Sequence, residues 1–339
     1  MSAAIRTAKT STAKTIRPAR KTLALLAAPA IAGSLLLCLP AAAHAAVRTP
    51  VDSTAAIQAL LNNPVNGVVN LPSGTFTVSP TLQLAHGETI IGHQTTLQVA
   101  ASSGDYVAVL EGATVSTDLS GLKISGVTFD QNSAANPITN LQALYGGDSR
   151  FVIRVSDGAD ISITNDSFLN TNNIITIATG GATSNVTISG NTFTGGTATP
   201  WHDHSSIYTS GTGTTISGNT FTGSHDITAI EVHGNQATVT GNTVSGYYRG
   251  INIVANNTTF TGNTITGSVG PVELWSTVAP GLHNITVTGN ALGQNVAGWA
   301  PYLKTVNSPM PPAPQLQQVF DAPTSTYPFT AITVSGNQA

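Results

Sequence analysis

A segment from residue 202 to residue 275 contains a large share of the side chains that could do acid–base chemistry. The candidate catalytic residues are four carboxylic acids: Asp203, Asp226, Glu231 and Glu273. Glycoside hydrolysis needs two such groups, because one protonates the leaving oxygen while the other acts as base or nucleophile. The side chains that could bind a sugar beside them are His202, Tyr208, His225, His233, Tyr248, Arg249 and Trp275.

These residues are scattered along the sequence, so only a regular fold would bring them together. The stretch Thr215–Gly223 reads Thr-Ile-Ser-Gly-Asn-Thr-Phe-Thr-Gly, and near-copies occur before and after it. Equivalent positions of successive copies are 25, 28, 23, 21 and 27 residues apart, at Asp166, Asn191, Asn219, Asn242, Asn263 and Asn290. Repeats of this length predict a β-solenoid, in which each repeat forms one turn, or rung, of two or three short strands.

The repeated Asn residues are interpreted as structural rather than catalytic. Stacked side-chain amides would bond to one another along the solenoid axis. They would do so at a tight turn, where Asn tolerates a left-handed backbone.

Aligning the repeats predicts which side chains share a face. A further strand follows each Gly-Asn copy, with inward residues expected at Ile207, Ile230, Ile251 and Val272. Side chains alternate along a strand. The outward column is therefore expected to contain Tyr208, Glu231, Asn252 and Glu273, with Ser210, His233, Val254 and Trp275 two positions further on.

The same alignment predicts the separations of the acids. His202-Asp203 aligns with His225-Asp226, with Arg249 one rung further on, beside Tyr247 and Tyr248. Rungs stack about 4.8 Å apart, so Asp203 and Asp226 would lie one rung apart, and Glu231 and Glu273 two. Both retaining and inverting separations would be available. Asp130 could reach the same face, but the register is lost across an expected loop at 131–150.

Other chemistries could use the same residues. A lyase or C5-epimerase acting on a uronate polymer would need a His base, Tyr248 and Arg249, with Ca²⁺ bound by the carboxylates to offset their repulsion. A transition metal could bind His202, His204, Glu231 and His233. A non-catalytic carbohydrate-binding surface protein would show aromatic residues without paired acids. The acids are present and the face has one Arg and no Lys, which favours a hydrolase without a cofactor.

The first 45 residues read as a secretory signal peptide. A basic stretch at 1–22 precedes an apolar run, Leu23–Leu39, and the small-residue cleavage signal Ala43-His44-Ala45. Without them, six Lys and Arg face fifteen Asp and Glu, a net charge of about −9 that disfavours nucleic acid as a partner. The single cysteine, Cys38, lies in this leader, so no disulfide is expected. We expect a protein secreted to the periplasm or outside the cell and free of the membrane, and leave its oligomeric state open.

Residues 46–339 are expected to form one domain. A helix at 53–62, with Ile57, Leu60 and Leu61 on one face, would cap the open end of the solenoid, where unpaired strand edges would otherwise recruit other chains. A Pro-rich segment at 291–328 would pack along the flank or cover the C-terminal end. The last rung would return at 329–337.

The N-terminal part resembles a known superfamily. A helix containing Ala56-Ile57-Gln58 is followed by Gly67-x-Val-x-Leu-Pro-x-Gly-x-Phe76 and then Ile90-Ile-Gly92. With the Ser-Gly-Asn repeats, this pattern is similar to the pectin lyase-like superfamily over roughly residues 51–337. The resemblance implies an all-β, single-stranded, right-handed parallel β-helix with a short N-terminal capping helix.

The same resemblance implies work on polysaccharides without fixing the reaction. The superfamily includes pectate lyases, polygalacturonases, other polysaccharide hydrolases, epimerases, phage tailspikes and proteins without enzymatic activity. The motifs of the pectate lyases and polygalacturonases do not occur here, so the site residues follow from the rung alignment alone. We therefore predict a secreted glycosidase that cleaves a polysaccharide or oligosaccharide.

Overall fold

The computed structural model describes residues 51–104, 106–137, 150–171, 175–195, 205–276, 281–295, 316–320 and 328–338, without the side chains of 224–227 and 316–320. All of these residues belong to one compact unit, Thr49–Ala339. The predicted signal peptide lies outside the described residues.

The described part of the chain contains no helix with the length and apolar character needed to cross a membrane.

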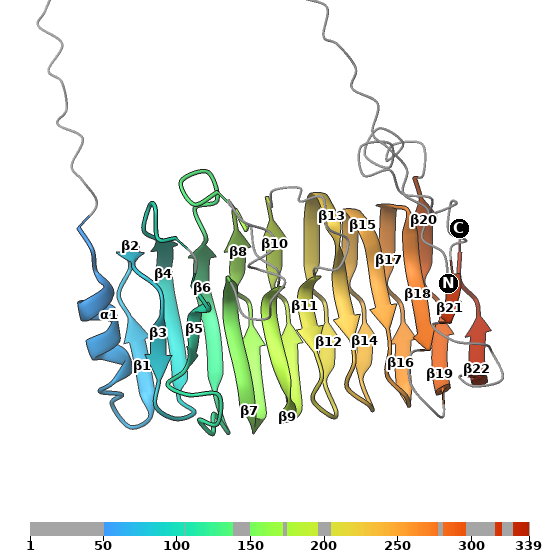
Figure 1. The fold of residues 1–339 in the computed structure, drawn as a ribbon, viewed down its shortest axis with the longest axis horizontal. Helices are drawn as coiled ribbons and strands as arrows, with labels where there is room; N and C mark the ends of the chain where they lie inside the picture. The colour runs from blue at the N-terminus through green and yellow to red at the C-terminus, as the bar shows by residue number, and fades with distance from the viewer. Residues whose placement is uncertain are drawn as a thin grey trace, which may run out of the picture. The chain divides into compact units, whose positions relative to one another are not determined.

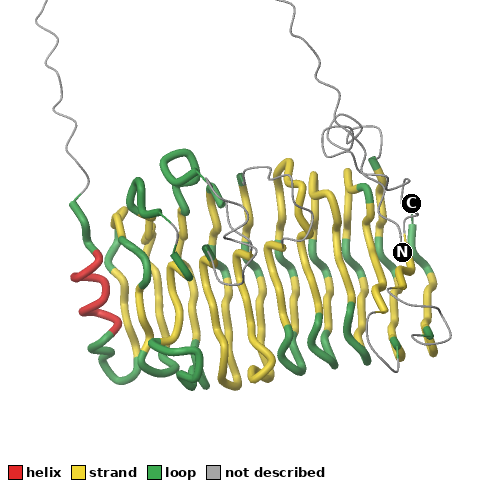
Figure 2. Tube along the Cα trace, viewed as in Figure 1, coloured by secondary structure: helices red, strands yellow, loops and turns green. Residues whose placement is uncertain are grey.

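The strands stack along one axis in chain order, and the pairings between them are parallel (Figure 1). Each rung contributes up to three strands, and the pairings join equivalent strands of successive rungs into three ladders. Figure 2 shows the strands and the turns of successive rungs side by side along the axis. The predicted fold class, an all-β parallel solenoid, is confirmed. Parallel pairing follows from the repeats, because each repeat returns the chain to the same starting point one rung along the axis.

The first ladder contains the Thr-Ile-Ser strands that precede each Gly-Asn pair. In order of sequence, its strands are β1 (Val68–Leu71), β4 (Thr89–Val99), β6 (Lys123–Asp130), β7 (Phe151–Thr164), β9 (Ile175–Ser189), β12 (Thr215–Ser217), β14 (Thr238–Thr240), β16 (Thr258–Thr261), β19 (Leu282–Thr288) and β22 (Phe329–Ser335). Some of these strands are long enough to continue into another ladder.

The second ladder contains the Thr-Phe-Thr strands that follow each Gly-Asn pair. It runs through β2 (Gly74–Val78), the ends of β4 and β6, β8 (Ser167–Leu169), β10 (Thr192–Thr194), β13 (Thr220–Val232), β15 (Thr243–Ile253), β17 (Thr264–Ser268) and β20 (Ala291–Gln294).

The third ladder contains the less regular strands and carries the candidate site. It runs through β3 (Leu82–Leu84), β5 (Ala108–Gly112), the starts of β7 and β9, β11 (Ser205–Thr209), the ends of β13 and β15, β18 (Gly270–Ser276) and β21 (Leu316–Phe320). β21 lies inside the segment interpreted as a Pro-rich flank, so part of that segment extends the ladder.

The core is a column of apolar side chains inside the rungs. Phe168, Phe193 and Phe221 stack with ring centroids 4.8 and 4.5 Å apart. Ile207 and Ile230, predicted as inward residues, are fully buried. Offset or stacked aromatic pairs add to the burial of apolar area, so the stack stabilises successive rungs against one another.

The Asn residues form the predicted ladder. Both the backbone N–H and Nδ2 of Asn191 donate to Oδ1 of Asn219, each at 3.0 Å. Nδ2 of Asn191 also donates to the carbonyl of Ile163 at 2.9 Å. The pattern repeats at Asn242 and Asn263, and these amides are buried. Each buried amide therefore finds partners on both neighbouring rungs.

The left-handed residue of each turn is the Gly before the Asn, not the Asn as predicted. Gly190 and Gly218 have φ angles of +66° and +61°. The earlier turn has Asn165 at the equivalent position, with φ +57°. Gly has no Cβ to oppose this conformation, and Asn is among the few other residues that adopt it. The repeated Gly thus supplies the turn and the repeated Asn supplies the bonds.

Helix α1 (Thr54–Leu61) packs against β1, β2 and β3 at the N-terminal end, as the capping prediction requires. Asp52 Oδ1 accepts the Thr54 N–H at 2.8 Å, which satisfies one unpaired donor of the first turn. Ile57 and Leu61 are buried, but Leu60 is 38% exposed and was wrongly predicted to face the core. The core-facing stripe is therefore narrower than the sequence pattern indicated.

Candidate functional site

The outward column has the register predicted from the repeats. Tyr208 pairs with Glu231, Glu231 with Asn252, and Asn252 with Glu273. The register also continues toward the N-terminus through Ala178, Arg154 and Glu111. We call the set Glu111, Arg154, Ala178, Tyr208, Glu231, Asn252 and Glu273 the outward column.

The first cluster on this column joins three of the predicted site residues. His233 Nε2 lies 2.7 Å from Glu231 Oε1, and the His233 ring lies 4.7 Å from the Tyr208 ring. The Glu231 side chain is 10% exposed and that of His233 is 31% exposed. The imidazole N–H donates to the carboxylate, so His233 holds Glu231 at a surface that solvent still reaches.

The second cluster lies two rungs further along. Arg249 Nε is 3.1 Å from Glu273 Oε2, and the two side chains are only 8% and 3% exposed. The guanidinium lies 5.8 Å from the Tyr248 ring and 5.6 Å from the Trp275 ring. Both distances are within the range of cation–π attraction. Arg249 is thus fixed between two aromatic rings and one carboxyl group.

The carboxyl group of Glu273 has a perturbed acidity. Burial raises the pKa of Glu273 because the ionised form loses its hydration, and the charge of Glu231 adds to the rise. The guanidinium of Arg249 opposes this effect by favouring the ionised form. Perturbed acids of this kind concentrate at functional sites, although structural ion pairs also produce them.

Asn252 separates the two clusters. It is 4% exposed, and its Oδ1 has no hydrogen-bond partner among the residues that the structure describes. A buried amide oxygen without a partner is costly, so such an atom calls for an explanation. It contrasts with the amides of the Asn ladder and points toward a bound water or ligand group between Glu231 and Glu273.

Several predicted site residues are not accessible to a substrate in the way we expected. Tyr247, expected on the outer face, is in the core, where its hydroxyl lies 3.0 Å from Ser206 Oγ. Tyr248 is 1% exposed, so its ring borders Arg249 rather than solvent. Burial raises the pKa of Tyr248. Asp130 belongs to the second ladder, where Gln98 and Asn170 donate to it.

Other predicted members lie partly or wholly outside the description. His202, Asp203 and His204 are outside the described residues. For His225 and Asp226 only the backbone is described, and His225 pairs with Tyr247. Among the described residues, no three His, Cys, Asp or Glu side chains gather closely enough to hold a metal ion.

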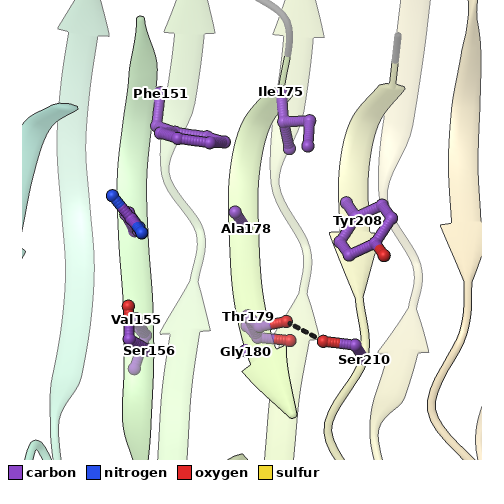
Figure 3. Close-up of a pocket in the computed structure, with 10 residues that line it drawn as sticks. Phe151, Val155, Ser156, Ile175, Ala178, Thr179, Gly180, Tyr208 and Ser210 are labelled. Atoms are coloured by element: carbon purple, nitrogen blue, oxygen red, sulfur yellow. Dashed lines mark hydrogen bonds between the residues drawn. The ribbon is translucent and has the colours of Figure 1, made fainter. Parts of the chain in front are cut away.

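A cavity opens beside the first cluster. Of the residues that line it, the sequence analysis gave Tyr208 as a site residue but not Phe151, Arg154 or Ala178. Ala178 forms its floor, with Phe151 on one side and Tyr208 on the other (Figure 3). Arg154, which pairs in register with Ala178, also lines the cavity. Its volume is about 160 Å³. Extending the rung alignment backward from Tyr208 to the strand Phe151–Val155 would have found it.

The fold and this geometry agree with one family of known proteins. Residues 49–272 match the family described as Rhamnogalacturonase A/epimerase, pectate lyase-like. The chain belongs to this family. Membership confirms the resemblance to the pectin lyase-like right-handed β-helices. No curated protein matches the sequence.

Solved structures share the fold at low sequence identity. The tailspike protein of E. coli bacteriophage HK620, in complex with a pentasaccharide, matches with a TM-score of 0.63 and 17% identity. The match covers 85% of this chain and 53% of the tailspike. The Streptococcus pneumoniae surface protein and adhesin PfbA matches with a TM-score of 0.55 and 15% identity, over 85% of this chain and 93% of PfbA. The chain thus spans about half the length of the tailspike, and these likenesses concern the fold alone.

Proposed function

We propose that the protein is a secreted glycosidase that hydrolyses a polysaccharide with Glu231 and Glu273. The observation that carries the proposal is that two carboxyl groups in different surroundings share one column. Glu231 is held by an imidazole near the surface, whereas Glu273 is buried beside Arg249. A glycosidase needs this kind of asymmetry, because one acid must hold a proton while the other does not.

The surroundings suggest which residue takes each role. Glu273 is the general acid, since burial and the neighbouring Glu231 raise its pKa and favour the protonated form. Glu231 is the base that activates water, oriented by His233 at 2.7 Å. The orphaned Oδ1 of Asn252 lies between them in the register and would accept a hydrogen bond from that water.

The spacing favours inversion at the sugar carbon. Glu231 and Glu273 are two rungs apart, so their Cα atoms are separated by about 9.6 Å. Inverting enzymes hold their carboxyl groups about 6.5–9.5 Å apart to leave room for a water, whereas retaining enzymes hold them about 5–5.5 Å apart. A separation of two rungs therefore lies nearer to the longer range.

Product analysis on purified protein tests the proposal. The protein would be incubated with a panel of neutral and uronate polysaccharides, and the products analysed by mass and anomeric configuration. Hydrolysis adds one water to the products, and inversion gives the opposite anomer first. Glu231→Gln and Glu273→Gln should each abolish cleavage. Asp160→Asn, an exposed acid on another part of the rung, is the matched control.

A lyase or C5-epimerase is the second candidate. It is favoured by Arg249, a cation on the same face that could neutralise a uronate carboxylate. An unsaturated product, detected by its ultraviolet absorbance, would replace the hydrolase proposal with the lyase. A change of sugar configuration without cleavage would indicate the epimerase. Saccharide binding without any product would leave a carbohydrate-binding protein.

A further inference from the structure

The outward column changes character on the N-terminal side of Tyr208. Ala178 is one rung from Tyr208 and one rung from Arg154, so a methyl group separates two long side chains along the column. Figure 3 shows Ala178 and Tyr208 on neighbouring strands. The resulting cavity has a volume of about 160 Å³. An engineered apolar cavity of about 150 Å³ binds benzene, so the space is on the scale of a single ring.

The walls of the cavity differ from end to end. Phe151 and Ile175 form an apolar end, while Ser210 lies at the other end, where its hydroxyl donates to the Thr179 carbonyl at 3.0 Å (Figure 3). Tyr208 offers a partly exposed ring on one side. Binding sites for small molecules combine apolar walls with a few placed polar groups. A pyranose, with its apolar faces and polar edges, suits such walls.

Arg154 gives the cavity its charge. Its side chain is 21% exposed, with a guanidinium nitrogen 3.8 Å from a Glu111 carboxylate oxygen. The guanidinium also lies 5.4 Å from the Phe151 ring. These contacts fix the position of the guanidinium while part of it remains open. A guanidinium presents parallel N–H donors that match the two oxygens of a carboxylate.

We propose that this cavity binds one sugar residue bearing a carboxylate, with its ring over Ala178 and its carboxylate on Arg154. The inference rests on the proposed function, because Tyr208 joins the cavity to Glu231 on the next rung. The substrate chain would then run along the solenoid axis. Its acidic residue would lie on the N-terminal side of the Glu231–Glu273 centre, two rungs from Glu231.

Binding measurements with matched probes test this proposal. The probes are oligosaccharides of galacturonate, glucuronate and mannuronate, each paired with its carboxyl-reduced, neutral form. Titration calorimetry would use the whole mature protein. We expect at least one acidic probe to bind about tenfold more tightly than its neutral form, the effect of one charge-assisted carboxylate pair. Equal affinities for every pair, or no binding of any probe, would overturn the proposal.

Variants locate the preference. Arg154→Gln should bind the acidic and neutral forms equally, whereas Ala178→Met, which fills the cavity, should weaken both. Lys123→Gln removes an exposed cation from the first ladder and should behave as the wild type. If Arg154→Gln still binds the acidic form more tightly than the neutral form, Arg154 is not the residue that binds the carboxylate. Melting curves check that each variant folds. If Arg154→Gln does not fold, Ala178→Met decides instead: unchanged binding to this variant would exclude the cavity as the binding site.

The proposed function can fail separately. Glu231→Gln should retain the preference for the acidic probe while losing cleavage. Cleavage by Glu231→Gln at the wild-type rate would reject the hydrolytic centre and leave the binding result standing. Loss of the preference in Arg154→Gln alone would support the cavity whatever reaction follows.

Discussion

The Asn ladder and the outward column are built on the same rungs but follow opposite rules. The ladder repeats one residue type, and each buried amide bonds to its neighbours, as in Asn219 and Asn242. The outward column changes residue type at every rung from Arg154 to Glu273. It contains a buried ion pair and an orphaned amide oxygen.

This difference separates structure from chemistry within one repeat. A solenoid is stabilised by contacts between neighbouring rungs, so identical residues at equivalent positions satisfy one another. A charged residue that interrupts the repetition has no identical residue on the neighbouring rung to pair with, and burying it costs desolvation free energy. In a chain of this kind, irregular positions next to a regular ladder are where function is to be sought.

Substitutions of the acids in the outward column should have the largest effect. Glu273→Gln and Glu231→Gln should each lower kcat/KM by about 10²–10⁴-fold, the usual contribution of a positioned acid or base. Glu231→Gln should leave the melting temperature close to that of the wild type, whereas Glu273→Gln should lower it, because the buried Arg249 loses its carboxylate partner. Steady-state kinetics and thermal melts measure both. Near-normal activity in either variant contradicts its catalytic role.

The reverse result is expected when the ladder is broken. Asn219→Ala leaves both amide donors of Asn191 without their acceptor, and frees the Ile188 carbonyl. Lost bonds and unsatisfied buried groups should lower the free energy of unfolding by about 3–5 kcal/mol. Denaturant titration measures this loss. The folded fraction should keep its specific activity, and a selective loss of activity would mean that the ladder is more than structural.

Asp166 occupies the ladder position that is Asn in the later copies of the repeat, so it tests the Asn ladder with an acid in place of an amide. Its Oδ1 accepts the Val127 N–H at 2.8 Å, but its buried Oδ2 has no partner among the described residues. Burial raises the pKa of Asp166 from 3.8 to about 7. A raised pKa means that the folded state prefers the protonated form. The contribution of Asp166 to the free energy of unfolding is therefore fully present below pH 4 and is lost as the pH rises to about 7.

Asp166→Asn should therefore stabilise the protein most at alkaline pH. The gain has an upper limit of about 4 kcal/mol above pH 7 and should vanish below pH 4. Unfolding titrations of both proteins from pH 4 to pH 9 measure it. A gain that is independent of pH would show that hydrogen bonding, not ionisation, limits the wild type at this position.

The smallest expected effect is a shift in pH dependence. Arg249 favours the ionised form of Glu273, so Arg249→Gln should raise the pKa of Glu273 further. If Glu273 acts while protonated, the alkaline fall of kcat/KM should move to higher pH. The pH profile measures this on the folded fraction, with Lys123→Gln as control. An unmoved alkaline limb would indicate that another group is the acid.

The sequence predicted the regular parts of this molecule well, for a physical reason. Gly-Asn copies mark the same point of each turn, so counting from Asn219 and Asn242 gave the correct register of Tyr208, Glu231 and Glu273. Side-chain burial was less predictable. Tyr247 and Tyr248 follow a register shift in β13–β15, and simple alternation does not survive such a shift.

The sequence prediction missed the cavity because a small residue defines it. Ala178 attracts no notice in the sequence, and its importance lies in what it leaves open between Arg154 and Tyr208. The sequence also does not predict which charged side chains pair with each other. The pairing of Arg249 with Glu273, rather than with Glu231, depends on side-chain directions that spacing alone does not contain.

The parallel stacking has a consequence for how such a site could be rebuilt. Groups on the outward column are separated by whole rungs, so their spacing changes only in steps of about 4.8 Å. Each step corresponds to a contiguous module of sequence, such as the 21 residues that separate Asn242 from Asn263. Removing or adding one module would bring Glu231 and Glu273 one step closer or further apart without redesigning either neighbouring strand. The number of repeats between Glu231 and Glu273 thus sets the distance between the two acids.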